Sequence, residues 1–434
     1  MDFTFTEEQQ AAAEAARGVF AGVAPDDVPS PALTRGAVAD DFDRALWARL
    51  ASADLLSLLL DEEFGGAGLD AIALCLVLRE ASKVLARVPL LENSAAVAAL
   101  QAYGGPELKS SLLARAGRGE IVLTVAANGR TGHDPAELAV TARQHDTADG
   151  SGGAGGTGRA GGVGRAGEAG SAGEAGRAGG VGEAHQTGMA DGQGVGGPGE
   201  PGGGEWVLDG VQTVVPWAYD ADFVVVPART GDDRSVLAVV ARGHEGVVLA
   251  EQISTTGERL GELRLESARI ADRDVITADG AWQWLRALLT TGTCAQALGL
   301  GERVLAMTSE YAGKREQFGH PIASFQAVAV QAADRYIDLR AMEVTLWQAA
   351  WRIAAGTPGA LPASGDVAVA KIWASEGVRR VVQTAQHLHG GFGADVDYPL
   401  HRYHAWAKHL ELSLGPAAAH EEALGDLLAA HPLG

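Results

Sequence analysis

The chain has 434 residues, 47% of them hydrophobic, which is enough for two or three domains with packed cores. Its formal net charge of −21 argues against nucleic acid and anionic membranes as partners, because their phosphates would be repelled. The two cysteines, Cys75 and Cys294, lack CxxC or CxxH spacing, so neither a disulfide framework nor a metal site is predicted. The polar first residues do not resemble a secretory signal, and no apolar run reaches the roughly 20 residues of a membrane span. We therefore expect a cytoplasmic protein without a membrane span.

Residues 1–120 are predicted to form an N-terminal helical domain. Thr6 and Gln9 have the spacing of a capping box at the start of a helix. The run at 72–85 is apolar almost all round, which predicts a buried helix. The glycine-rich turn at 61–68 has two interpretations, a phosphate-binding loop or a connection between helices. No strand precedes the turn, which favours the connection.

Residues 121–275 are predicted to form a middle β domain, because short β-type runs alternate with Gly and Asp turns there. The density of short strands is typical of a compact antiparallel barrel or sandwich. The predicted strands cover residues 121–125, 206–208, 211–215, 223–226, 236–240, 247–249 and 263–265.

The segment 148–204 interrupts this β pattern with loose glycine-rich repeats. Its composition offers too little apolar surface to offset the entropy of folding, so we expect a disordered insertion. The insertion has two interpretations, a functional lid or a neutral expansion, and the second is favoured.

Residues 276–434 return to long helical periodicity, which predicts a C-terminal four-helix bundle. The expected fold class is therefore α+β: a helical domain, an antiparallel β-barrel or sandwich, and a helical bundle.

Two motifs in the predicted bundle suggest a cofactor site. The first is Arg315-Glu316-Gln317-Phe318-Gly319 with Phe325-Gln326, and the second is His387-Leu388-His389-Gly390-Gly391-Phe392-Gly393 with Tyr398-Pro399 and Arg402. Together with the order of the domains, they resemble the flavin-binding signatures of the acyl-CoA dehydrogenase family. The resemblance covers the whole chain apart from the glycine-rich segment.

The resemblance implies FAD as the cofactor. Arg315 would reach the pyrophosphate, a role that suits a permanently charged, forked donor, with Gln317 beside it. An arginine on the surface of a helix is the alternative for Arg315. The resemblance also implies that Phe318, Ile322 and Phe325 pack against the adenine or its surroundings.

The second motif would complete the same site. Gly390 and Gly391 would let the dinucleotide approach the backbone. In the family this glycine pair serves the FAD of a neighbouring subunit, which implies a homo- or hetero-oligomer. His387 stands where the family usually has a glutamine. A metal site at His387 and His389 is disfavoured, because residues at i and i+2 do not share a helix face. In the β domain, Thr124 matches a family threonine that meets the isoalloxazine ring.

The chemistry that the resemblance implies needs a carboxylate base near the α carbon of an acyl thioester, while a hydride passes from the β carbon to flavin N5. The family position of this base holds Leu414, and an alternative position on the first bundle helix matches Leu289. Both are apolar, so the sequence leaves the catalytic base unidentified. The family's Trp-Ile-Ser/Thr stack is replaced by residues 214–216, Val-Val-Pro. Other carboxylates of the predicted bundle could act as the base instead, although such residues more often lie on the solvated face of a helix. They are Glu302, Glu310, Glu411, Glu421 and Glu422.

Three enzymatic functions are compatible with these patterns. The first is an FAD-dependent acyl-CoA dehydrogenase-like oxidoreductase acting on CH–CH groups of an acyl thioester. The second is a base-lacking subunit of a heteromeric dehydrogenase, paired with a homologous chain. The third is a flavin monooxygenase of the same fold, and a scaffold without flavin is the non-enzymatic alternative. The pattern specifies neither the acyl group nor the electron acceptor.

Overall fold

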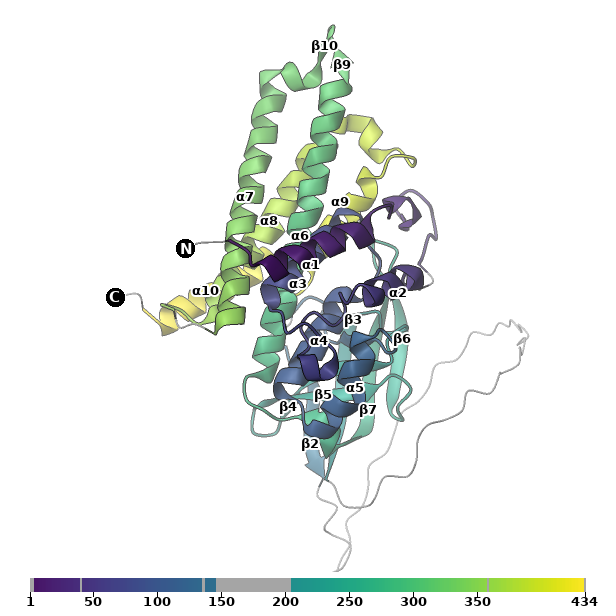
Figure 1. Ribbon diagram of the computed structural model, residues 1–434, viewed down its shortest axis with the longest axis vertical. Coiled ribbons are helices and arrows are strands. Elements are labelled where there is room, and N and C mark those ends of the chain that lie inside the picture. The colour runs from purple at the N-terminus through teal and green to yellow at the C-terminus, as the bar shows by residue number, and fades with distance from the viewer. Residues whose placement is uncertain (1–3, 40, 135–136, 146–203, 357–358, 433–434) are drawn as a thin grey trace, which may run out of the picture. The chain divides into compact units, whose positions relative to one another are not determined.

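The computed structural model describes residues 4–39, 41–134, 137–145, 204–356 and 359–432 (Figure 1). These residues belong to one compact unit. The predicted glycine-rich insertion lies outside the described residues, apart from Gly204. The boundaries proposed for the three domains stay a prediction.

The N-terminal part is helical, as expected. Its helices are α1 (Glu7–Phe20), α2 (Arg44–Ser52), α3 (Ala71–Lys83), α4 (Leu90–Tyr103) and α5 (Pro106–Gly117), with short 3-10 turns η1 (Pro25–Asp27) and η2 (Glu62–Phe64). The capping box of α1 is present: the Gln9 N–H donates to Thr6 Oγ1 at 3.2 Å, and the Thr6 N–H donates to Gln9 Oε1 at 3.0 Å. The turn at 61–68 folds back on the residue before it, because a Cβ on Gly66 would lie 2.0 Å from the Leu60 carbonyl oxygen. It connects η2 to α3.

The β region forms one eight-stranded sheet, mostly antiparallel, with strand order β6-β7-β3-β2-β4-β5-β8 and β1 paired to β4. The strands are β1 (Leu123–Val125), β2 (Val140–His145), β3 (Glu205–Pro216), β4 (Phe223–Thr230), β5 (Ser235–Ala241), β6 (Val247–Ile253), β7 (Arg259–Ala271) and β8 (Val275–Ile276), with a 3-10 turn η3 (Asp272–Asp274) before the last. The pairings β1–β4 and β2–β4 are parallel, which the sequence did not predict.

Strand β3 is irregular where it ends. Its pairing with β7 shifts register between Gln212 and Val215. Val214 and Trp217 both have a φ of 54°, in a left-handed region that bulky side chains rarely adopt. This end of β3 meets the helical bundle and forms part of the cavity described below.

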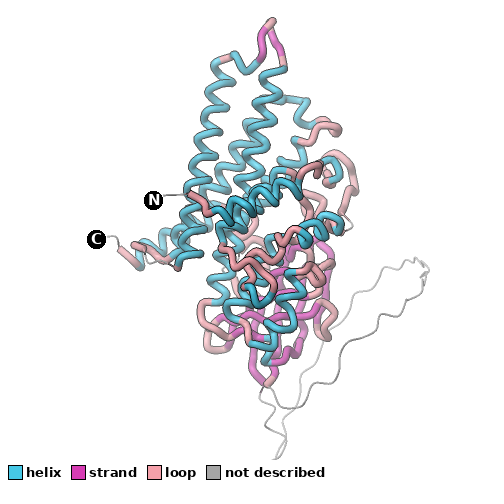
Figure 2. The backbone as a smooth tube through the Cα atoms, viewed as in Figure 1, coloured by secondary structure: helices cyan, strands magenta, loops and turns pink. Residues whose placement is uncertain are grey.

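The C-terminal part is a helical bundle (Figure 2). Its elements are α6 (Ala281–Lys314), the hairpin β9 (Glu316–Gln317) and β10 (His320–Pro321), η4 (Ile322–Ser324), α7 (Gln326–Ala355), α8 (Ala363–His389), η5 (Gly390–Ala394), α9 (Leu400–Leu412) and α10 (Ala417–Ala430). Figure 1 shows β9 and β10 at the end of α6 and α7 farthest from the sheet. Within the described ranges, no helix is both long and apolar enough to span a bilayer.

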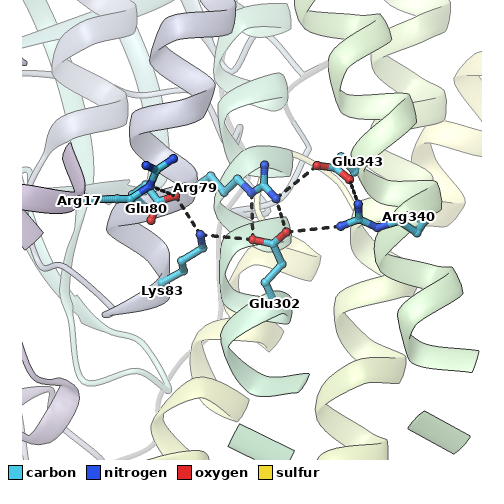
Figure 3. A network of polar contacts seen from close by, with 7 residues as sticks. All are labelled: Arg17, Arg79, Glu80, Lys83, Glu302, Arg340 and Glu343. Carbon is cyan, nitrogen blue, oxygen red and sulfur yellow. Dashed lines mark hydrogen bonds and ion pairs between the residues drawn. The ribbon is translucent and has the colours of Figure 1, made fainter. Parts of the chain in front are cut away.

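A network of ion pairs joins the N-terminal helices to the bundle (Figure 3). Arg79 on α3 donates to both carboxylate oxygens of Glu302 on α6, and it also contacts Glu343 on α7 at 3.2 Å. The same helices are in close contact, because a Cβ on Gly299 would lie 2.0 Å from the Arg79 carbonyl oxygen. Partly buried charges need their partners, so the network fixes how α3 lies across α6 and α7.

Candidate functional site

A cavity of about 90 Å³, here called the central cavity, lies between the sheet, the N-terminal helices and the bundle. Its walls come from α4, the ends of β1 and β3, the start of β7, α6 and α9. The lining residues that matter below are Glu92, Asn128, Val214, Pro216, Trp217, Glu258, Leu289, Trp406, His409 and Leu414.

Both positions predicted for the catalytic base line this cavity, and both are leucine. Leu289 reaches it from α6, and Leu414 reaches it from the turn after α9. Leu414 has a φ of 56°, and its carbonyl accepts a hydrogen bond from His420 Nε2 at 2.8 Å. The two positions therefore lie in the wall of one cavity, but neither side chain can accept a proton.

The five carboxylates considered as replacements do not line the cavity. Glu302 belongs to the ion network with Arg79, Glu310 pairs with Lys314, and Glu411 pairs with Lys408. The remaining two are exposed on α10: Glu421 and Glu422. Among the described residues, none of these five is placed to act as the base of the central cavity.

The structure instead places a different carboxyl in the cavity, that of Glu92 in the first turn of α4. Its Oε2 accepts a hydrogen bond from Trp217 Nε1 at 3.2 Å, and no ion pair to a described residue neutralises it. Burial raises the pKa of Glu92 to about 7, because the charged form loses its hydration. Glu258, the other carboxyl in the wall, is instead paired with Arg87 at 2.5 Å.

Sequence reasoning missed Glu92. The available signal was an acidic residue in the otherwise apolar run LLENSAAVAAL, a pattern in which a buried charge is unusual. Its partner Trp217 is 125 positions away, so only the fold brings the two together.

Basic groups lie behind the Leu414 turn. Lys371 is fully buried on α8, and its Nζ donates to the carbonyls of Leu410 at 2.8 Å and Glu411 at 3.1 Å, at the C-terminal end of α9. Burial lowers the pKa of Lys371 to about 8 and that of His409 to about 4. His409 is therefore a neutral imidazole in the cavity wall at pH 7.

Four side chains from outside β3 hold its last residues in place. Asn128 Nδ2 donates to the Val214 carbonyl at 3.0 Å, and the Val214 N–H donates to Gln252 Oε1 at 2.8 Å. Thr124 Oγ1 donates to the Pro216 carbonyl at 2.6 Å, and Glu92 accepts from Trp217. The Thr124 side chain is fully buried, so its hydroxyl already has an internal partner. A contact of Thr124 with a flavin ring stays a prediction.

A second hollow, here called the Arg315 pocket, lies at the opposite end of α6 and measures about 340 Å³. It brings the two cofactor motifs together: Arg315 stands beside Phe392 and Tyr398 from the second motif. The other lining residues are Met307, Glu310, Tyr311 and Lys314. Arg315 is exposed and forms no ion pair with any described residue, so its guanidinium is available to an anion.

The other cofactor residues predicted in the two bundle motifs do not line this pocket. Gln317, His387, Gly390 and Gly391 are exposed, and Phe318 is 93% exposed with its ring edge-on to Phe325 at 6.5 Å. Ile322 and Phe325 are half-buried at the start of α7.

The glycine pair leaves an open surface. Nothing lies within 4 Å of the point where a Cβ would stand on Gly390 or Gly391. Gly390 also has a φ of 58° with a ψ of −136°, a conformation open essentially to glycine alone. This surface fits the close approach of a ligand to the backbone.

An aromatic wall supports the Arg315 pocket. The Tyr311 ring stacks on Phe392 at 5.4 Å and on His389 at 4.3 Å. His389 is buried, and its Nε2 lies 3.0 Å from the Tyr398 hydroxyl. His389 therefore helps to build this wall.

The two hollows lie along the same helix. Gln296 lines the central cavity and Met307 lines the Arg315 pocket, and these two residues are 11 positions apart on α6, which corresponds to about 17 Å. The central cavity is small: at about 90 Å³ it is below the roughly 150 Å³ of an apolar protein cavity that binds a single benzene molecule. A flavin ring is larger than benzene and does not fit in it.

Comparison with known proteins shows the family to which the chain belongs. Residues 6–120 match the model of the acyl-CoA dehydrogenase N-terminal domain, and residues 289–428 match that of the acyl-CoA dehydrogenase C-terminal domain. The acyl-CoA dehydrogenase FadE27 of Mycobacterium tuberculosis is 35% identical over 440 residues, covering 100% of both chains. The chain belongs to the acyl-CoA dehydrogenase family. It is thus an oxidoreductase, and the predicted order of helices, sheet and bundle is confirmed.

Solved structures agree with this assignment. The ChsE4-ChsE5 complex from Mycobacterium tuberculosis contains a chain that matches with a TM-score of 0.79 at 32% identity, covering 100% of both chains. A variant of the Tcur3481-Tcur3483 steroid acyl-CoA dehydrogenase matches with a TM-score of 0.76 at 30% identity, covering 98% of both chains. The name of each of these two proteins joins two gene products.

Proposed function

We propose that this acyl-CoA dehydrogenase family member is one subunit of a two-chain, FAD-dependent enzyme that desaturates the α,β bond of an acyl thioester. The chain contributes its Arg315 pocket to a flavin site that a second, homologous chain completes. FAD, when bound, supplies the hydride acceptor. A cytoplasmic location remains a prediction.

One observation carries the proposal: the two hollows of this chain differ in which features of a flavin site they retain. The Arg315 pocket has a guanidinium that no described residue pairs with, an open glycine surface and an aromatic wall. The central cavity has leucine at both base positions and too little room for a flavin ring. A chain with these properties can bind part of a dinucleotide, but it needs a partner for the rest of the site.

The relatives support the two-chain form. Two similar solved structures, at 32% and 30% identity, carry the names of two gene products each. FAD agrees with the family and with PigA, a structure of the same fold that was determined with FAD. The flavin monooxygenase alternative has no specific support in the geometry of this chain.

Within such a site, Arg315 would bind the pyrophosphate, and its planar fork would orient it. Gly390 and Gly391 would allow the dinucleotide to lie against the backbone. Phe318, Ile322 and Phe325 would pack against the adenine, with Gln317 and His387 as polar groups at the edge. These roles are proposals for the described side chains.

The Arg315→Ala variant tests the proposal in the complex with the second chain. We expect its FAD content to fall at least tenfold, because a charge-assisted, bidentate contact is lost. Arg49→Ala, which removes an exposed arginine from α2, serves as the matched control and should keep its FAD. The readout is the flavin absorbance per complex after gel filtration. Stoichiometric FAD in the Arg315→Ala complex would refute the pyrophosphate assignment.

A further inference from the structure

The end of β3 is held in a conformation that its residues disfavour. Val214 and Trp217, one β-branched and one large and aromatic, both have a φ of 54°. Such conformations persist only where the surrounding structure over-determines them, and they cluster at functional sites. Here Asn128, Gln252 and Thr124 hold three backbone groups of this segment, and Glu92 holds the indole of Trp217.

These restraints direct the indole ring of Trp217 into the wall of the central cavity. Its side chain is nearly buried, with 9% of the residue exposed, and it lines the cavity. The ring lies edge-on to Phe42, with centroids 6.2 Å apart and planes at 88°. Its Nε1 donates to Glu92 Oε2 at 3.2 Å, so both the apolar and the polar part of the indole are engaged.

We propose that Trp217 is an internal plug. Its indole ring fills space that would otherwise belong to the central cavity, and it thereby sets the largest group that this chain can admit there. The Glu92 carboxylate anchors the plug at its only polar atom. Trp217 is thus a specificity-determining residue, since it limits the cavity to groups smaller than a flavin ring.

The proposal rests on the proposed function and deepens it. If the central cavity of this chain is plugged, an acyl thioester and a flavin ring can meet only in the cavity of the second chain. This role explains the strained backbone, because the left-handed φ at position 217 places the side chain in the cavity wall. When the indole is absent, the vacated space should accept a planar aromatic molecule with one N–H donor.

The test is replacement of the plug by free indole. Trp217→Gly removes the ring, and glycine adopts a φ of 54° without strain. We expect the full-length Trp217→Gly chain to bind one indole per chain by isothermal titration calorimetry and to melt at a higher temperature when indole is present. The native chain should show neither effect. Trp217→Asn is the second variant in case the glycine variant folds poorly, because asparagine tolerates the left-handed region.

Trp47→Ala is the matched control. Trp47 lies edge-on to the same Phe42 ring at 5.7 Å, and its Nε1 donates to the Gly119 carbonyl, but it does not line the cavity. Stabilisation by indole should therefore be specific to position 217. If folded Trp217→Gly and Trp217→Asn chains bind no indole, or if Trp47→Ala binds it equally well, the plug is refuted.

The anchor has a separate readout. In Trp217→Gly, indole should bind more tightly than 1-methylindole, which lacks the N–H donor, and the additional Glu92→Leu change should abolish this difference. Equal affinities in Trp217→Gly would contradict the anchoring role of Glu92. These measurements require neither flavin nor the second chain, so failure of the plug and failure of the proposed function are distinguishable.

Discussion

Glu92 shows how the fold changes the acidity of a single residue. In the sequence it is an acidic residue in an apolar helix, but in the structure it lines a cavity and accepts a hydrogen bond from Trp217. Removal from water raises its pKa from 4.5 to about 7. The folded chain therefore binds a proton at Glu92 that the unfolded chain has already released between about pH 4.5 and pH 7.

This shift predicts the pH dependence of stability. The raised pKa means that the contribution of Glu92 to stability falls as the pH rises from 4.5 to 7, by at most about 3 kcal/mol. Glutamine has no such titration. We expect Glu92→Gln to be more stable than the native chain at pH 8 by about 1–3 kcal/mol and similar to it at pH 5, as measured by urea unfolding.

Glu258→Gln is the control for this measurement, because Glu258 lines the same cavity but is paired with Arg87. Loss of that pair leaves the partly buried Arg87 without its carboxylate, so the variant should be less stable at both pH values. Parallel pH profiles for the native chain and Glu92→Gln would show that Glu92 is not desolvated.

At the scale of elements, the ion network explains how α3 is fixed against the bundle. Glu302 on α6 is 17% exposed at its side chain and contacts Arg79, Lys83 and Arg340. Glu310 lies two turns further along the same helix, where its ion pair among the described residues is with the exposed Lys314, and its own side chain is 61% exposed. The two glutamates thus offer a comparison of a buried network with a surface pair.

We expect Glu302→Gln to destabilise the chain by about 1–3 kcal/mol, because Arg79 keeps its charge but loses its principal partner. Glu310→Gln should change stability by less than about 0.5 kcal/mol. The measurement is the free energy of unfolding from urea titration of both variants. Equal effects would mean that the network is no stronger than a surface pair.

Helices and strands were predictable from the sequence where neighbouring residues carry the signal. The α1 capping box needs only Thr6 and Gln9, and the structure confirms it. The runs 206–208 and 211–215 were predicted as separate strands, but they form one strand, β3, because Gly210 lies at a bulge and not at a turn. Strand β2 was not predicted, because its run AVTARQH contains few large apolar residues. Its strand partners are also distant in the sequence.

The candidate site was also predictable only in part. The motifs around Arg315 and Gly390 could be read from the sequence, because short-range patterns carry them, and the structure brings both to one pocket. Glu92 and Trp217 could not, because their significance depends on a contact across 125 positions and on a backbone angle. The engagement of the Thr124 hydroxyl by Pro216 was hidden for the same reason.

At the scale of the whole molecule, two hollows along α6 have different linings. The Arg315 pocket is proposed to bind the nucleotide part of a cofactor. The central cavity lacks both a base at the expected positions and room for a flavin ring. On the proposed function, an enzyme built from this chain needs a second chain, and each pair of chains should contain a single complete flavin site.

The FAD content of the two-chain complex tests this claim most directly. The chain is coexpressed with a homologous acyl-CoA dehydrogenase chain, the complex is purified, and the flavin absorbance is compared with the protein concentration and the subunit ratio. We predict one FAD for each pair of chains, and little or none for this chain expressed alone. Two FAD molecules per pair, or one FAD bound to each copy of this chain alone, would contradict the account.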